Sequence, residues 1–263
     1  MKQVKAKIDQ LRLMIPRSNL NTDDHDLPID FEKVEDLLGL TDIVPEYDLR
    51  SHAFNGYTDS LVFGDGLIRV NWHSKRKDMG ILVDFTASGK AYYESMARTI
   101  DIKINWQHII QRLYKKYAGH TSRVDVCVDL ISQGFDVDLI YRKLVTGEYQ
   151  FFNGKYHPIG LDRINHIGNA NKVSTIYCNS RYSDAFLRIY DKKLAELTKK
   201  TALYKATARD SSDWIRVEGE YKGKLARKIG LTIANAHTNA IGPYLANFIL
   251  QNWTLRVNDQ KEN

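Results

Sequence analysis

One stretch of the chain decides the fold: S-R-Y-S-D-A-F-L-R-I-Y-D-K-K, from Ser180 to Lys193. Read at the period of two that a strand imposes, Arg188 and Tyr190 fall on one side and the aliphatic residues between them on the other. The stretch therefore predicts a half-buried strand that presents a guanidinium and a tyrosine hydroxyl together. Asp191 follows directly and is placed to cap a helix, because Asp is favoured at that position.

A tyrosine beside several cations has the components for covalent attack on a phosphodiester. The hydroxyl is a nucleophile, and positive charge stabilises the phosphate as it becomes pentacovalent. The cations near Tyr190 are Arg181, Arg188, Lys192 and Lys193. For one tyrosine among 15, a structural role at the end of a strand is the simpler alternative. The rest of the chain has to decide between the two.

Composition places the chain among ordinary globular proteins. It has 263 residues, 43% of them hydrophobic, which is enough for the core of one large domain or two small ones. The net charge of +6 favours acidic partners such as nucleic acid without proving one. No apolar run approaches the length of a membrane span, and the two cysteines lack C-x-x-C spacing. We therefore expect a cytoplasmic protein without membrane association, a zinc site or a disulfide framework.

The order of predicted elements is mixed, not strictly alternating. A basic segment and a polar loop open the chain up to residue 29, and Asp30 is placed to cap a helix that ends at Gly39. Hairpin signals from 60 to 87 predict an antiparallel meander, whose second turn carries Lys75, Arg76 and Lys77 as candidate DNA contacts. Further strands are predicted at 122–130, 149–156, 173–178 and 214–221, and helices at 89–99, 106–117, 136–144, 191–208, 224–236 and from 244.

Three of the predicted strands each hide one face and expose a charged one. Asp125 and Asp129 alternate with valines in 122–130, and Glu218 and Glu220 flank a glycine on the polar side of 214–221. If these strands are neighbours of the one that holds Tyr190, the carboxylates and the tyrosine share one surface. A salt-bridged surface explains any single strand, but three together favour a site. The prediction is an α+β fold in which helices flank a central antiparallel sheet with a charged catalytic face.

Carboxylates beside a tyrosine form the oxygen-rich setting that Mg²⁺ or Mn²⁺ prefers. A divalent ion there would neutralise a phosphate oxygen and help a hydroxyl of pKa about 10 to act near neutral pH. The candidate ligands are Asp125, Asp129, Glu218 and Glu220, although the two aspartates stand about 13 Å apart along an ideal strand, so one of them could serve only to orient an arginine. The eight histidines form no H-x-H pair and the chain has no G-x-x-x-x-G-K-[ST] motif, so neither a histidine-paired metal site nor a built-in motor is expected.

Four blocks of sequence are informative when they are taken together. They are F-T-A-S-G-K-A-Y-Y-E-S (85–95), R-V-D-V-C-V-D-L (123–130), the stretch 180–193, and W-I-R-V-E-G-E-Y-K (214–222). In order and spacing the series resembles the replication initiation factor (Rep-trans) family of Gram-positive rolling-circle plasmids, over about residues 55–225. The resemblance implies that Tyr190 is the DNA-nicking nucleophile and that the four carboxylates are metal-site candidates. Leu130 stands where the family usually has a second aspartate.

The resemblance implies one replication-initiator domain over residues 1–263, whose flanks outside the core carry DNA specificity or dimerisation. Such a protein binds its plasmid's double-strand origin, nicks one strand through a 5′-phosphotyrosine, frees a 3′-hydroxyl primer and rejoins the DNA at termination. The scissile segment is expected to be single-stranded or extruded in a hairpin. One tyrosine per chain predicts a homodimer that supplies a second nucleophile, and the missing motor predicts a host helicase as partner.

Three other interpretations remain open from the sequence. A conjugative relaxase or a phage initiator would use the same chemistry on a different origin. A non-enzymatic origin-binding repressor would use the charged face only as scaffold. A strand exchanger similar to the tyrosine recombinases would need no metal. If Tyr190 is not the nucleophile, Tyr182 and Tyr177 are next in line.

Overall fold

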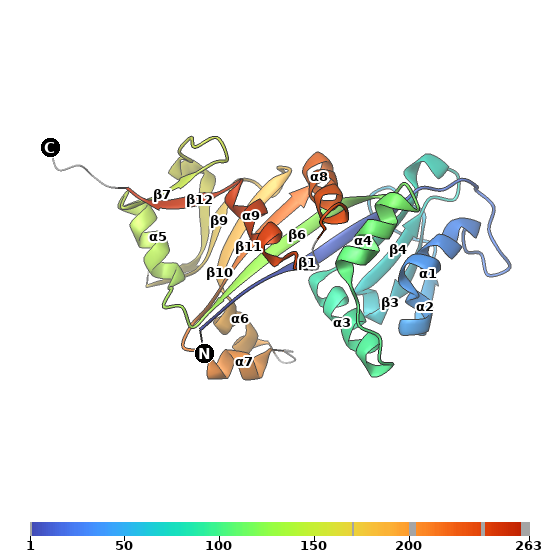
Figure 1. Cartoon of the computed structure of the whole chain (residues 1–263), viewed down its shortest axis with the longest axis horizontal. Helices are drawn as coiled ribbons and strands as arrows, with labels where there is room; N and C mark the ends of the chain where they lie inside the picture. The colour runs from blue at the N-terminus through green and yellow to red at the C-terminus, as the bar shows by residue number, and fades with distance from the viewer. Residues whose placement is uncertain (1, 170, 200–203, 238–239, 259–263) are drawn as a thin grey trace. The chain divides into compact units, whose positions relative to one another are not determined.

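The computed structural model describes residues 2–169, 171–199, 204–237 and 240–258, whose strands and helices are drawn in Figure 1. The chain forms two compact units: unit 1 is Met1–Ile8, Asp125–Tyr221 and Gly242–Asn263, and unit 2 is Asp9–Val124 and Lys222–Ile241. Two long strands, β1 (Gln3–Ile15) and β6 (His120–Ile131), contribute residues to both units. Because strands are shared, this division does not test the prediction of a single domain.

Unit 2 contains the predicted meander. The antiparallel strands β2 (Tyr47–Arg50), β3 (Asp59–Phe63), β4 (Ile68–Trp72) and β5 (Ile81–Phe85) pair in sequence order, and β1 pairs with β5. Its helices are α1 (Glu32–Leu38), α2 (Leu40–Ile43), α3 (Ala87–Thr99), α4 (Trp106–Lys115) and α8 (Gly223–Ala234), with 3-10 turns η1 (Ile29–Phe31), η2 (Gly64–Gly66) and η3 (Lys77–Met79). Phe85, Tyr93 and Trp106 join strand to helix in the core, with ring centres 5.2 to 5.9 Å apart.

Unit 1 holds the strands with charged faces. After β6 come β11 (Trp214–Lys222), β10 (Ala185–Asp191), β9 (Lys172–Cys178) and β8 (Ile164–Asn169), in that spatial order. A small second sheet pairs β7 (Tyr149–Phe152) with β12 (Thr254–Val257). The helices are α5 (Val137–Val145), α6 (Lys192–Thr198), α7 (Lys205–Asp210) and α9 (Gly242–Leu250), with the 3-10 turn η4 (Leu161–Arg163). The predicted α+β class, with helices around an antiparallel sheet, is confirmed.

Several boundaries differ from the prediction. The segment expected as one helix over 191–208 contains α6 and α7, and residues 200–203 lie outside the described part of the chain. The opening basic segment is the long strand β1, and part of the loop expected between 156 and 173 is β8. The short strands β2 and β12 were not predicted. β2 and β12 have only four residues each, too few for alternation to stand out, β8 has only two apolar residues, and the charged residues of β1 favoured a surface segment.

Asp30 does not cap a helix as expected. It lies in η1, one residue too early, and the N-cap position of α1 is the apolar residue Phe31. Its buried carboxylate instead accepts hydrogen bonds from the Ser18 amide and hydroxyl, the Asn19 amide and the Lys33 ammonium. Burial alone would raise the pKa of Asp30, but these hydrogen bonds outweigh it and lower the pKa to about 2. Gly39 ends α1 in the left-handed conformation, with φ of 57°, as predicted.

None of the helices in the described ranges combines the length and the apolar character needed to cross a bilayer.

The lowered pKa of Asp30 gives a stability prediction. The folded state favours the charged carboxylate, so this stabilisation is present above pH about 4 and is lost as pH falls through about 2. Asp30→Asn should lower the free energy of unfolding by about 2 kcal/mol at pH 7, and the difference from wild type should shrink in acid. Denaturant unfolding across this pH range measures it. Exposed Asp24 gives the control, Asp24→Asn, and an equal loss in both variants would contradict the assignment.

Candidate active site

The three charged strands are neighbours, as the sequence required. In unit 1, β6 lies beside β11 and β11 beside β10. The antiparallel register sets Arg188 opposite Glu218 and Tyr190 opposite Arg216. Directly opposed residues of paired strands point to the same face, so these four side chains share one surface of the sheet. The predicted adjacency is confirmed.

The same rows continue across the sheet toward its edge. On β9, Tyr177 lies opposite Arg188 and Thr175 lies opposite Tyr190. On β8, Asn165 lies opposite Tyr177. One row therefore runs from Glu218 through Arg188 and Tyr177 to Asn165, and the next row contains Tyr190.

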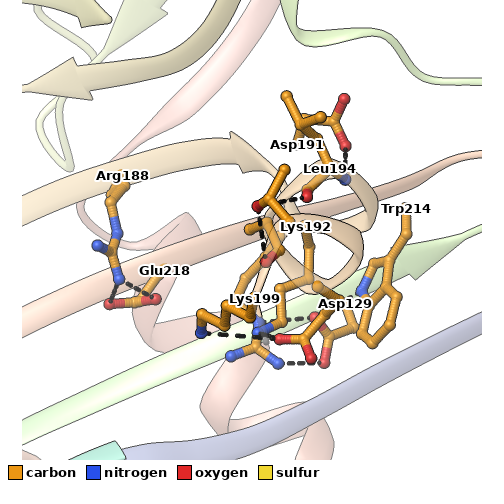
Figure 2. A network of polar contacts seen from close by, with 12 residues as sticks. Asp129, Arg188, Asp191, Lys192, Leu194, Lys199, Trp214 and Glu218 are labelled. Carbon is orange, nitrogen blue, oxygen red and sulfur yellow. Dashed lines mark hydrogen bonds and ion pairs between the residues drawn. The ribbon is translucent and has the colours of Figure 1, made fainter. Parts of the chain in front are cut away.

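Arg188 is held beside Tyr190 by a carboxylate. One of its terminal nitrogens donates to both oxygens of Glu218, at 2.6 and 2.8 Å, as Figure 2 shows. Its guanidinium lies 4.7 Å from the centre of the Tyr190 ring. Burial would lower the pKa of Arg188, but the charge and hydrogen bond of Glu218, with smaller contributions from Tyr190 and Tyr177, raise it. The guanidinium therefore stays charged next to the phenol, where it would stabilise a phenolate.

Asp129 forms a buried ion pair with Arg216. Its two oxygens accept hydrogen bonds of 2.7 and 2.8 Å from Arg216, and the first also accepts one of 2.9 Å from the Trp214 indole. Asp129 is 4% exposed and Arg216 is 3% exposed. With both oxygens engaged and no open side, Asp129 does not fit the expected role of metal ligand. It orients the arginine that lies opposite Tyr190.

Besides Glu218, the candidate metal ligands that remain are Glu220 and Asp125, which is itself buried at 2% exposed. Two contacts between β6 and the chain around β11 follow one antiparallel register: the Asp129–Arg216 pair, and the hydrogen bond from the Ser132 amide to the Asp213 carbonyl. We infer from this register that Asp125 lies opposite Glu220. No three His, Cys, Asp or Glu side chains in the described ranges are grouped to hold a metal ion. Two carboxylates are nevertheless enough for Mg²⁺, which commonly completes its shell with water and substrate phosphate. The oxygen donors are of the right kind.

Lys192 and Lys193 do not lie where phosphate contacts would. Lys192 is 6% exposed and its ammonium binds Glu196 within α6 (Figure 2). Burial and the charge of Arg216 together lower the pKa of Lys192. Lys193 donates to the main-chain carbonyls of Ser211 and Ser212. The helix itself begins as predicted, with the Asp191 carboxylate accepting from the Leu194 amide.

The other predicted DNA contacts lie on the surface. Arg181 is exposed and its guanidinium lies 5.5 Å from the Tyr177 ring centre and 5.4 Å from that of Phe186. In unit 2, Lys75, Arg76 and Lys77 are exposed in the turn between β4 and β5, where Arg76 pairs with Asp78 at 2.7 Å.

A hollow that sequence reasoning missed lies next to Arg181. Its volume is about 610 Å³, and its walls come from η4, β8, β9, the start of β10 and the loop before it. The signal in the sequence was slight: Asn165, Tyr177 and Phe186 meet because the consecutive strands β8, β9 and β10 pair, and β8 was not predicted as a strand.

The fold has a known counterpart. The chain is similar to the structure of a rolling circle replication initiator protein from Geobacillus stearothermophilus, with 21% identity and a TM-score of 0.73 over 99% of this chain and 90% of that one. No protein-family model and no curated protein matches the sequence. At this identity the similarity establishes a shared fold.

The buried pair gives a prediction that separates a scaffold role from a metal role. Asp129→Ala leaves the Arg216 charge buried without its partner, so the free energy of unfolding should fall by about 3 kcal/mol or more. Denaturant unfolding without divalent metal measures this loss. The control is Asp184→Ala, at an exposed aspartate of the same unit. If wild type and Asp129→Ala are equally stable without Mg²⁺, and wild type is the more stable only when Mg²⁺ is added, Asp129 is a metal ligand instead.

Proposed function

We propose that this protein is a rolling-circle replication initiator that nicks one strand of its plasmid's double-strand origin at Tyr190 and later rejoins it. The observation that carries the proposal is the place of Tyr190, on the charged face between Arg188 beside its ring and Arg216 opposite it. The similarity in fold to a rolling circle initiator over nearly the whole chain supports it.

The chemistry is a transesterification. The Tyr190 oxygen forms a bond to the scissile phosphorus as the bond from phosphorus to the 3′ oxygen breaks. The phenol proton leaves to solvent, and the departing 3′ oxygen takes up a proton. The products are a 5′-phosphotyrosine and a free 3′-hydroxyl that primes synthesis. Because the ester is retained, attack by a 3′-hydroxyl reverses the step and rejoins a strand.

Arg188 is the residue placed to assist this step. Its charge would favour the phenolate of Tyr190, and its remaining N–H groups would donate to the phosphate that Tyr190 attacks. Glu218 keeps the guanidinium in place, so Glu218 acts as a positioning residue. Arg216 adds positive potential from the row of Tyr190, while its own pair with Asp129 keeps it fixed.

Asp125 and Glu220 would hold Mg²⁺ or Mn²⁺, with Glu218 nearby on the same strand as Glu220. Such an ion, when bound, supplies positive charge for a non-bridging phosphate oxygen. The proposal includes single-stranded or hairpin origin DNA as substrate, a second copy of the chain that supplies another tyrosine, and a host helicase, all in the cytoplasm. Lys75, Lys77 and Arg76 would follow the DNA backbone.

The nucleophile is tested by removing one oxygen. Tyr190→Phe should abolish the covalent protein–DNA adduct that forms on supercoiled plasmid carrying the origin in Mg²⁺ or Mn²⁺, while leaving DNA binding and the unfolding midpoint unchanged. Denaturing gel electrophoresis detects the adduct. The matched control is Tyr244→Phe, at an exposed tyrosine of α9 in the same unit, which should leave the adduct unchanged.

Other outcomes select other functions. An adduct that persists in Tyr190→Phe moves the nucleophile to another tyrosine, with Tyr182 and Tyr177 next in line. Origin binding by the wild type without any adduct favours the repressor. An adduct that forms in EDTA favours a strand exchanger similar to tyrosine recombinases. Substrate choice among plasmid, conjugative and phage origins separates the remaining interpretations.

The metal is tested by removal and by Glu220→Gln. EDTA should abolish adduct formation but not binding of single-stranded DNA. Glu220→Gln should raise the Mg²⁺ or Mn²⁺ concentration needed for half-maximal adduct formation at least about tenfold, since one charged ligand is lost. Glu148→Gln, at an exposed glutamate of the same unit, should leave it unchanged. An unaltered metal requirement in Glu220→Gln would place the ion elsewhere.

A further inference from the structure

The hollow beside Arg181 has the dimensions and chemistry of a binding site. Its volume of about 610 Å³ lies within the range of small-ligand pockets. Its walls combine aromatic rings, both signs of charge and amides, and they include Asp162, Arg163, Asn165, Tyr177, Arg181 and Phe186. All of these residues belong to unit 1.

Three flat groups lie close together on one wall. The rings of Tyr177 and Phe186 are nearly parallel, at 24° with centres 5.4 Å apart. The Arg181 guanidinium lies close to both of them, at 5.5 and 5.4 Å. Aromatic rings and guanidinium planes are the surfaces on which unpaired bases stack.

The polar groups suit a base better than a phosphate. Asp162 would repel a phosphate by its charge, yet a carboxylate accepts hydrogen bonds from the amino and imino groups of a base. Arg163 is next to it in η4 and can donate to ring acceptors. Guanine has the acceptors O6 and N7 as well as N–H donors, so an arginine that donates and a carboxylate that accepts match guanine best. The Asn165 amide, beside Tyr177, offers both a donor and an acceptor.

The hollow is next to the proposed nucleophile on the same face. Tyr177 lies opposite Arg188, whose guanidinium contacts the Tyr190 ring. Phe186 and Tyr190 are four residues apart on β10, a separation of about 13 Å. A single strand whose phosphate lies at Tyr190 therefore passes the hollow within a short run of nucleotides.

We propose that this hollow takes one unpaired base of the DNA strand near the scissile phosphate, with guanine the preferred base. Arg181 then acts by stacking, not as the phosphate contact that the sequence predicts. This inference rests on the proposed function, because that function supplies the single strand. It adds a base-reading subsite, built by η4, β8, β9, the loop before β10 and the start of β10, to a site whose nucleophile is at the end of β10.

The test uses Arg181→Lys, which keeps the charge but removes the flat guanidinium. The probes are a short fluorescein-labelled oligo(dT), the same oligomer with one dG, and an abasic oligomer of equal length. All are bound to full-length protein in the Tyr190→Phe background, and anisotropy gives the affinity. We expect the dG oligomer to bind more tightly than oligo(dT). Arg181→Lys should weaken both base-containing oligomers about tenfold and leave the abasic oligomer unchanged.

The control is Arg209→Lys, at an exposed arginine of α7 in the same unit, which should change none of the three affinities. Unchanged binding in Arg181→Lys, or an equal loss on the abasic oligomer, would show a charge contact with phosphate and overturn the proposal. If the Tyr190→Phe protein without further substitutions binds the oligomers with and without dG equally tightly, the guanine preference is overturned. Asn165→Ala, on an exposed edge position, gives a second variant expected to reduce that preference.

The two proposals fail separately. Anisotropy measures binding and needs no strand cleavage. Base-dependent binding, together with no covalent adduct from the wild-type protein, would therefore reject the nicking function alone. A normal adduct with base-independent binding would reject the hollow alone.

Discussion

The charged face depends on the buried contact between Asp129 and Arg216. A guanidinium and a carboxylate, each almost fully removed from water, join β6 to β11, and Trp214 supplies a further hydrogen bond. Removing either partner would leave a buried charge uncompensated, which is far more costly than losing an exposed pair. This requirement fixes the register between the two strands. β11 in turn pairs with β10, so that the fixed Arg216 lies opposite Tyr190.

Exposure increases along the face from β6 to β8. Asp129 and Arg216 are buried, Arg188 and Tyr190 are half-buried, and Asn165 is exposed. The ion pair of Arg188 with Glu218 follows this gradient, since the arginine side chain is 34% exposed and the glutamate 7%. A large, charged ligand such as DNA can approach only the exposed part of this face. The Asp129–Arg216 pair at the buried end is therefore scaffold, and DNA approaches from the β10 to β8 end.

The sequence predicted this surface because period two is local. Alternation in 122–130, 185–191 and 214–222 assigns each charged residue to a face, and pairing of the strands then brings the faces together. Partner choice is not local. Nothing in the spacing of Asp129 distinguishes a metal ligand from the partner of Arg216, and Lys192 reads as a surface cation until Glu196 and Trp214 surround it. The edge strand β8 has little apolar alternation, so its contribution to the hollow was invisible.

The distribution of carboxylates explains how one face holds many charges without becoming unstable. Asp129 and Glu218 neutralise Arg216 and Arg188, so the two acids nearest to Tyr190 in the rows are already committed to arginines. A phenolate at Tyr190 is then surrounded by guanidinium groups whose positions do not depend on DNA. Asp125 and Glu220 stand one row further, beyond Glu218, where added negative charge does not oppose ionisation of the phenol as strongly. The arrangement keeps fixed guanidinium groups beside the nucleophile before DNA arrives, which is the preorganisation that stabilises developing charge.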